Sequence, residues 1–143
     1  MARDHFASLI SMYAAAPVNQ IYQPTLKLQE GYAEIEIETS ENLFHSAGAT
    51  HGSVYFKMLD DAAWFAANTL EKEFFVLTTS FTTYITRPIS SGKMKSIGRV
   101  VNRNNSQYIA EAIVYDEQDR EIGRGNGIIV PGKLPLKDAK GYS

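Results

Sequence analysis

Residues 49–67 read ATHGSVYFKMLDDAAWFAA and predict one long helix around which the rest of the chain packs. Alanine, leucine and methionine favour helix, and the stretch contains no proline. Apolar side chains occupy most sides of this helix, which is typical of a helix buried under a sheet. At about 100° per residue, Lys57, Asp61 and Asn68 share one polar stripe. Asp60 lies on the shoulder of that stripe.

Two groups of this helix can carry chemistry. The helix begins at Gly52, and its first backbone amides have no intrahelical partner. Because glycine has no side chain, a ligand can approach this backbone closely, and an amide there can stabilise a developing oxyanion. Asp60 lies about two turns further along, at about 5.4 Å per turn, which is too far to contact the same substrate atom. The two groups can meet at one substrate only if a second copy of the chain supplies one of them.

The composition limits the classes of function. The 143 residues suit one domain, and a net charge of −2 without a basic run argues against a nucleic-acid partner. The absence of cysteine excludes disulfides and thiolate chemistry and is compatible with a reducing cytoplasm. The histidines at positions 5, 45 and 51 lack zinc-site spacing, so we expect no metal and no other cofactor. No apolar run is long enough to cross a bilayer, so we expect no membrane partner and a cytoplasmic location.

The remaining sequence predicts an α+β domain in which an antiparallel sheet packs on the central helix. A short amphipathic helix over residues 4–16 ends before Pro17, and its apolar stripe needs a sheet edge or a neighbouring subunit as partner. Strands are expected over residues 21–30, 33–39, 74–86, 93–102, 107–115 and 121–130, the last four as a meander. Pro24 indicates an edge position for the first strand. We expect a single domain over residues 1–143, with a core over about 20–131 and a frayed tail over 132–143.

The last predicted strand carries glycines at every second position. Gly123, Gly125 and Gly127 share one face of the sheet, where they let another group approach closely.

The order of these elements and two short motifs resemble the hotdog-fold acyl-CoA thioesterases of the phenylacetate-pathway group. The motif of that group reads roughly His-Gly-Gly, six variable residues, Asp, a small residue and Ala, and this chain has HGS at 51–53 and LDDA at 59–62. The resemblance covers about residues 21–130, including Thr-Arg-Pro at 86–88 and Gly-Arg-Gly-Asn-Gly at 123–127. It implies a hotdog fold, in which an antiparallel sheet wraps around one long helix, and hydrolysis of an acyl-CoA or acyl-carrier thioester.

Carried over position by position, the resemblance implies a site shared between the subunits of a homodimer, or of a dimer of dimers. Gly52 would supply the oxyanion-hole amide, and Asp60 of the other subunit would act as general base on water or as nucleophile. Thr78 lies where relatives often place a Ser or Thr that positions the water. The candidate substrate-binding residues are His45, His51, Ser53 and Trp64.

Several of these residues also have an ordinary structural explanation. Asp61 shares a helix face with Lys57, so an ion pair is favoured over catalysis. His51 fits a structural hydrogen bond at the start of the helix. Thr78 lies in a run of strand threonines where packing explains it, and Trp64 fits a core or dimer contact.

Two departures from the family pattern leave other functions open. Ser53 replaces the second glycine of the motif, and His45 replaces an asparagine. His45 also opens an HSAG sequence that resembles the His-x-x-Gly loop of hotdog dehydratases, although the proline-rich part of that motif is missing. A hydroxyacyl-thioester dehydratase or hydratase using His45 and Asp60 is therefore an alternative, as is a non-catalytic acyl-thioester binding protein. The basic residues that can hold coenzyme A phosphates are Arg87, Lys93, Arg99, Arg103 and Arg124.

Overall fold

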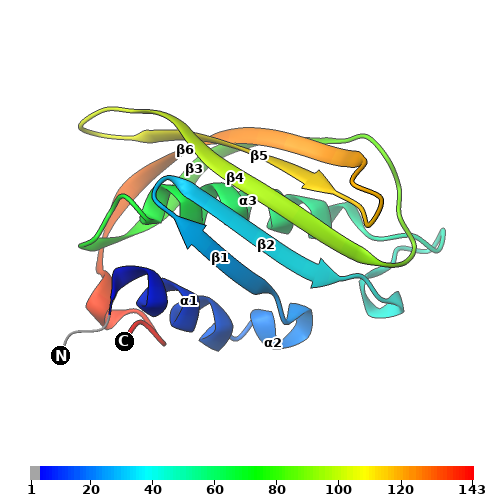
Figure 1. The fold of residues 1–143 in the computed structure, drawn as a ribbon, viewed down its shortest axis with the longest axis horizontal. Helices are drawn as coiled ribbons and strands as arrows, with labels where there is room; N and C mark the ends of the chain where they lie inside the picture. Colours follow the sequence, from blue (N-terminus) through cyan, green and yellow to red (C-terminus); the bar gives the residue numbers. More distant parts are fainter. Residues whose placement is uncertain (1–3) are drawn as a thin grey trace.

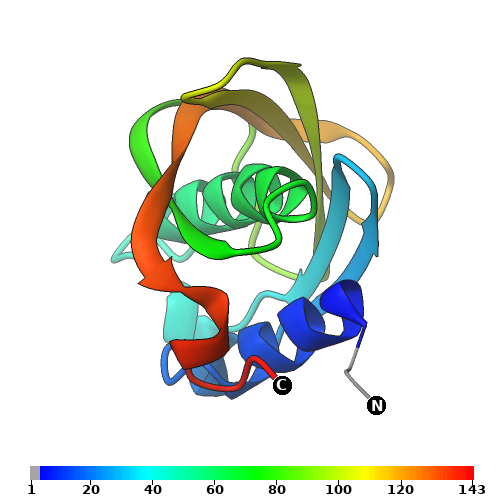
Figure 2. The same cartoon turned by 90° about the vertical axis from the view of Figure 1, so that its left-hand side faces the viewer.

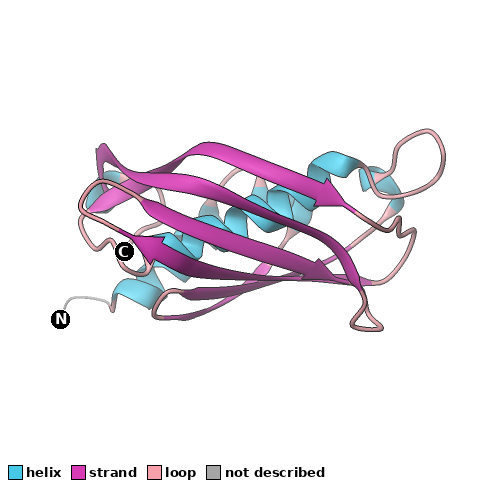
Figure 3. Cartoon of the chain, turned by 90° about the horizontal axis from the view of Figure 1, so that it is seen from above, coloured by secondary structure: helices cyan, strands magenta, loops and turns pink. Residues whose placement is uncertain are grey.

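The computed structural model describes residues 4–143, so residues 1–3 of the expected 1–143 domain lie outside the described range. Within that range, six strands form one antiparallel sheet in the order β1-β2-β4-β5-β6-β3, and the sheet wraps around α3 (Figures 1, 2 and 3). The elements are α1 (His5–Ala15), α2 (Asn19–Tyr22), β1 (Thr25–Gln29), β2 (Tyr32–Glu38), η1 (Glu41–Leu43), α3 (Gly52–Asn68), β3 (Phe74–Ile85), β4 (Lys93–Arg103), β5 (Tyr108–Tyr115), β6 (Glu121–Pro135) and η2 (Leu136–Asp138). The expected α+β architecture is confirmed.

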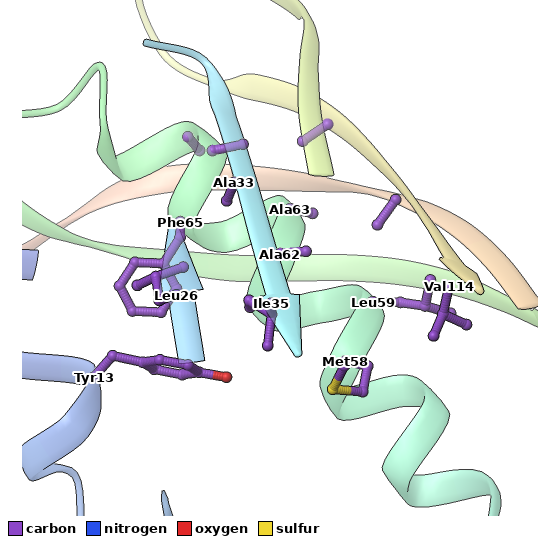
Figure 4. Close-up of a cluster of buried hydrophobic side chains, with 14 of the residues drawn as sticks. Tyr13, Leu26, Ala33, Ile35, Met58, Leu59, Ala62, Ala63, Phe65 and Val114 are labelled. Carbon is purple, nitrogen blue, oxygen red and sulfur yellow. The ribbon is translucent and has the colours of Figure 1, made fainter. Parts of the chain in front are cut away.

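The central helix α3 is buried on most of its surface, as its composition predicts. Leu59 and Ala62 of α3 belong to one buried cluster with Ile35 of β2 and Val114 of β5 (Figure 4). The sheet lies very close to this helix, because a Cβ on Gly98 of β4 would lie only 2.7 Å from the backbone nitrogen of Ala63. The sheet therefore fixes the rotation of α3 and, with it, the direction in which each polar side chain of α3 points.

The expected meander of the last four strands is wrong. β4 pairs with β2 and β5, whereas β3 pairs with β6 at the other end of the sheet. Because α3 is apolar on most sides, strands must cover both of its flanks, and α3 contacts both β4 and β3. The close approach expected at the β6 glycines is confirmed, since a Cβ on Gly125 or Gly127 would lie 2.6 Å from the Phe81 ring of β3.

The expected strand over residues 21–30 is too long. Residues 21 and 22 belong to α2, and β1 begins only at Thr25. Gln23 ends α2 with a left-handed backbone (φ 49°) and Pro24 follows it, so the chain turns before it can enter the sheet. β1 does lie at the edge of the sheet, as Pro24 indicated.

The tail over residues 132–143 is packed rather than frayed. β6 continues through Pro131, which pairs with Val76, as far as Pro135. Leu136 then buries its side chain with 1% exposure, and the Tyr142 hydroxyl lies 2.7 Å from Nδ1 of His5. Burial of an apolar side chain and a hydrogen bond to α1 together hold this segment against the domain.

The amphipathic helix α1 finds its partner within the same chain. Leu9 and Tyr13 are buried, and the Tyr13 ring packs edge-on against Phe65 of α3, with a centroid distance of 4.6 Å. Ile10 of the same helix is 39% exposed. α1 therefore covers one end of the flank of α3 that carries Asp60 and Asp61.

Candidate functional site

Asp60 lies half-buried in the middle of α3, and within residues 4–143 its side chain makes one side-chain hydrogen bond. The Thr78 hydroxyl of β3 donates to Asp60 Oδ1 over 2.8 Å. This contact joins two residues that are 18 positions apart, because β3 covers the flank of α3 from which Asp60 projects. The structure thus brings together the two residues to which the resemblance assigned the carboxylate and the water-positioning role.

The surroundings of Asp60 raise the pKa of its carboxyl group. Burial is the largest cause, the Thr78 hydrogen bond opposes it, the negative charge of Asp61 adds to it, and the positive charge of Lys57 opposes it. A carboxylate with a raised pKa is a stronger base than an exposed one, and a raised pKa is common among catalytic acids and bases.

The neighbouring carboxylate, Asp61, has two side-chain partners, Tyr13 and Lys57. Tyr13 of α1 donates its hydroxyl to Asp61 Oδ2 over 2.7 Å, and the Lys57 ammonium lies 2.7 Å from the same oxygen. The ion pair expected between Lys57 and Asp61 is confirmed, and the two side chains are only 16% and 20% exposed. Burial and the Asp61 charge raise the pKa of Tyr13, so this hydroxyl stays protonated and donates. Asp61 therefore anchors α1 to α3.

A pocket of about 230 Å³ opens beside Asp60, between α3 and the segment formed by α1 and the start of α2. Its apolar walls include Met12 and Ala16 from the α1 side and Trp64 and Phe75 from the other. The Trp64 indole N–H donates to the Val76 carbonyl over 2.8 Å, and its ring lies 4.7 Å from the Phe75 ring. Trp64 is thus a packing residue that also lines this pocket.

Gly52 is the first residue of α3 and lines a separate pocket of about 340 Å³. His45, Ile85 and Arg87 also line this second pocket. Nδ1 of His45 accepts a hydrogen bond from the Ala47 backbone N–H over 3.1 Å, which holds the imidazole in its loop. Within one chain the structure therefore does not bring Gly52 or His45 together with Asp60.

His51 and Ser53 form the cap of α3. Nδ1 of His51 accepts from the Ser53 backbone N–H over 3.0 Å, and the Ser53 hydroxyl lies 2.8 Å from the same nitrogen. The structural interpretation of His51 is confirmed. Both side chains line a third pocket, together with Tyr22.

The sequence did not identify α1 as part of the Asp60 site. Tyr13 contacts Asp61, and Met12 and Ala16 line the Asp60 pocket, although 44 or more residues separate them from Asp60. The apolar periodicity of residues 6–13 predicted a buried face, but it did not indicate which surface that face would cover.

The basic candidates differ in their surroundings. Arg124 is bound to Glu121, with its Nη2 at 2.6 Å and its Nε at 2.8 Å from the carboxylate oxygens. Arg99 lies over the Tyr32 ring at 4.8 Å. Among the five, Arg87 is the residue that lines the Gly52 pocket. In the part of the chain that the structure describes, no three metal-ligating side chains gather, and no helix has the length and hydropathy to span a membrane.

Comparison with protein families and with curated proteins gives matches to thioesterases and esterases. The model of the Thioesterase superfamily matches residues 47–122, just over half of the chain. The protein named "Putative esterase SSO1253" from Saccharolobus solfataricus is 27% identical over 90 residues, which are 63% of this chain and 60% of that protein. A "Putative esterase" from Sulfurisphaera tokodaii is 26% identical over 103 residues, 71% of this chain and 76% of that protein. The match thus spans less than two thirds of the first relative.

Solved structures share most of this architecture. The E. coli PaaI protein, from the phenylacetic acid degradation operon, superposes with a TM-score of 0.83 at 14% identity, covering 92% of this chain and 95% of that one. A mutant of the thioesterase enzyme SAV0944 from Staphylococcus aureus superposes with a TM-score of 0.78 at 12% identity, covering 82% and 100%. Identities this low establish the fold alone, and they confirm the expected hotdog fold.

Proposed function

Since the chain belongs to the thioesterase superfamily, we propose that it hydrolyses an acyl-CoA-type thioester with Asp60 as its catalytic carboxylate. The observation that carries this proposal is the environment of the Asp60 side chain. Its side chain lines an apolar pocket, its pKa is raised, and Thr78 is its one side-chain hydrogen-bond partner among the described residues. The adjacent carboxylate, Asp61, is instead bound by Lys57 and Tyr13.

The proposed chemistry uses the Asp60 oxygen that Thr78 does not hold. As a general base, this oxygen takes a proton from the water that attacks the thioester carbonyl carbon. As a nucleophile, it attacks that carbon itself, and water then cleaves the resulting anhydride. In both cases the carbon–sulfur bond breaks, the thiolate leaves and takes up a proton, and the Gly52 N–H stabilises the oxyanion.

Distance supports a site built from two copies of the chain. Asp60 and Gly52 are eight residues apart on one helix, which is about 12 Å at a rise of 1.5 Å per residue. Donors in an oxyanion hole lie about 3 Å from the oxygen that they stabilise. One protomer therefore cannot place both groups on the same carbonyl.

The edge strand β3 offers a way for a second copy to complete the site. Thr78 of β3 contacts Asp60, and Ile85 of β3 lies beside Gly52, where an added Cβ would be 3.0 Å from its Cδ1. If two β3 strands pair antiparallel with Thr78 opposite Ile85 of the partner subunit, each Asp60 lies near the partner's Gly52. A twofold axis near the middle of β3 then gives two equal sites.

The surface of this edge also favours a partner. β3 is 12 residues long and lies at one end of the sheet, so its outer backbone groups have no strand beside them in the described chain. Leu77, Tyr84 and Ile85 on β3 are 50%, 57% and 49% exposed. A long exposed edge with apolar side chains is the kind of strand that pairs with another chain.

Two finer points of the proposal concern the substrate carrier and the location. Arg87 lines the Gly52 pocket, and a guanidinium there suits the phosphates of coenzyme A or of a phosphopantetheine carrier. The cytoplasm, where such thioesters are made and used, stays the predicted location.

The test is thiol release from a panel of acyl-CoAs with increasing acyl length, followed with a thiol-reactive dye. Gly52→Pro removes the amide at the first helical position, where proline is tolerated, and Gly52→Ala is the matched control that keeps the amide. We expect the proline variant to lose about 100-fold or more in kcat and the alanine variant to keep most of it. Equal activity of the two variants would contradict the role of the amide.

The same panel separates the alternatives. Interconversion of enoyl- and 3-hydroxyacyl-CoA without thiol release would replace the proposal by a dehydratase. Binding of coenzyme A thioesters with no turnover of any of them would replace it by a binding protein.

A further inference from the structure

The pocket beside Asp60 is lined by the proposed catalytic carboxylate and lies under the N-terminal helix. Its walls come from Met12, Ala16 and Val18 on one side and from Trp64 and Phe75 on the other. The polar groups in these walls are the two carboxylates and the side chains of Tyr13, Asn19 and Lys57, and the other lining residues are largely apolar. Small-molecule sites are mostly apolar with a few placed polar groups, and this pocket has that character.

We propose that this pocket holds the acyl group of the substrate and that the α1–α2 segment sets the size of the acyl group that the protein accepts. This inference rests on the proposed hydrolysis at Asp60. With the thioester carbonyl at the Asp60 carboxylate, the acyl carbons extend along Trp64 and Phe75 toward Ala16 and Val18. The coenzyme portion leaves in the other direction, because residues of α1 line the pocket on this side.

The volume of the pocket gives the expected size. An apolar cavity of about 150 Å³ holds benzene, which has six carbons. By proportion, a pocket of about 230 Å³ has room for about nine non-hydrogen atoms. An octanoyl group, with eight carbons and one oxygen, fills this space, whereas an acetyl group leaves most of it empty and a palmitoyl group exceeds it.

The wall contributed by α1 is fixed before any substrate binds. Tyr13 bonds to Asp61 over 2.7 Å, and the buried side chain of Asn19 donates to the Tyr13 carbonyl over 2.7 Å. The first bond ties the end of α1 to α3, and the second ties the start of α2 back to α1 across Ala16. A rigid wall limits the length of a ligand, whereas a loose segment would move aside for a longer one.

The experiment fills the pocket from the α1 side. Ala16→Leu adds three carbons at the wall, and Ala14→Leu is the matched control, because it makes the same change two residues away at an exposed position outside the pocket. Val18→Phe is a second filling variant at a half-exposed position, so that the test does not depend on the folding of one protein. Far-UV circular dichroism and thermal unfolding confirm that each variant is folded.

The measured quantity is the ratio of kcat/KM for octanoyl-CoA to kcat/KM for acetyl-CoA. We expect the wild type and Ala14→Leu to share one ratio and to prefer octanoyl- over palmitoyl-CoA. Ala16→Leu and Val18→Phe should lower the octanoyl-to-acetyl ratio by about tenfold or more, since a pocket contact of two or three carbons discriminates by about this factor.

The outcomes distinguish this inference from the proposed function. If the wild type cleaves acyl-CoAs and the filling variants leave the ratio unchanged, the acyl group binds elsewhere and the inference is overturned, while hydrolysis stands. Equal cleavage of octanoyl- and palmitoyl-CoA by the wild type would also overturn it. If no acyl-CoA releases its thiol, hydrolysis itself fails.

Discussion

Asp60 and Asp61 are adjacent in the sequence and line the same pocket, yet their side chains bind partners from two different regions of the molecule. One residue along a helix is a turn of about 100°, and here that turn brings Asp60 to Thr78 of β3 and Asp61 to Tyr13 of α1. On the β3 side, a neutral hydroxyl is the side-chain partner of Asp60, and its pKa is raised. On the α1 side, Asp61 binds a cation and a phenol. Asp61 therefore links α1 to α3, whereas Asp60 has one carboxylate oxygen without a side-chain hydrogen bond among the described residues.

The sharpest test of this difference is Asp60→Asn. The amide keeps the shape of the side chain but cannot act as base or nucleophile, so kcat/KM for the best acyl-CoA should fall about 100- to 10,000-fold. Because burial disfavours the charged Asp60, the midpoint of thermal unfolding at pH 7 should stay the same or rise. A variant that keeps its turnover would remove Asp60 from the mechanism.

Asp61→Asn is expected to show the reverse pattern. Loss of the charge leaves Lys57 half-buried without its partner and weakens the hydrogen bond from Tyr13. The free energy of unfolding, measured by urea unfolding, should fall by about 1–3 kcal/mol. The fold-loss in kcat/KM should be smaller than that of Asp60→Asn by a factor of at least about ten. If both variants lose activity equally, the two carboxylates do not divide the roles as described.

Thr78→Val tests the smaller contribution of the Asp60 partner. Valine has the shape of threonine but cannot donate, so kcat/KM should fall about tenfold, in line with one hydrogen bond to a charged group. The Thr78 bond lowers the pKa of Asp60, so its loss should raise that pKa further. Activity requires the ionised form, and the acidic limb of the kcat/KM profile should therefore move to higher pH. A threonine that only packs in the strand would leave the limb where it is.

The smallest expected effect is on the pH dependence of stability. The pKa of Asp60 is higher in the folded protein than in the unfolded chain, so the folded state binds the proton first as the pH falls. This carboxyl group should therefore add stability as the pH falls through its folded pKa toward about 3.9, the value in an unfolded chain. The difference in unfolding free energy between wild type and Asp60→Asn, measured across this range, isolates the contribution. A difference that is constant with pH would contradict the raised pKa.

Local patterns explain which features could be predicted from the sequence. The composition of residues 49–67 predicted α3, and the strict alternation in residues 33–39 predicted β2, because each pattern reports one element and its buried face. The cap formed by His51 and the ion pair of Lys57 and Asp61 were also predicted, since both span at most a helical turn.

Features that depend on packing between distant segments could not be predicted in this way. The bond from Tyr13 to Asp61 crosses 48 residues, and its existence depends on where α1 settles on the finished domain. The pairing of β3 with β6, and the burial of Leu136, depend equally on how the sheet closes around α3. The family resemblance gave Thr78 a water-positioning role but did not predict its hydrogen bond to Asp60, because no local pattern links a strand threonine to a helix carboxylate.

The central claim, that Asp60 of one subunit works with Gly52 of another, is tested most directly by mixing two inactive variants. Asp60→Asn and Gly52→Pro are co-expressed with different affinity tags, and the thiol release of the mixture is compared with that of each variant alone. In a randomly paired dimer, half of the molecules carry both chains, and one of their two sites has an intact Asp60 and an intact Gly52. The account predicts recovery of about a quarter of the wild-type activity. A mixture as inactive as its two components would contradict a site shared between subunits.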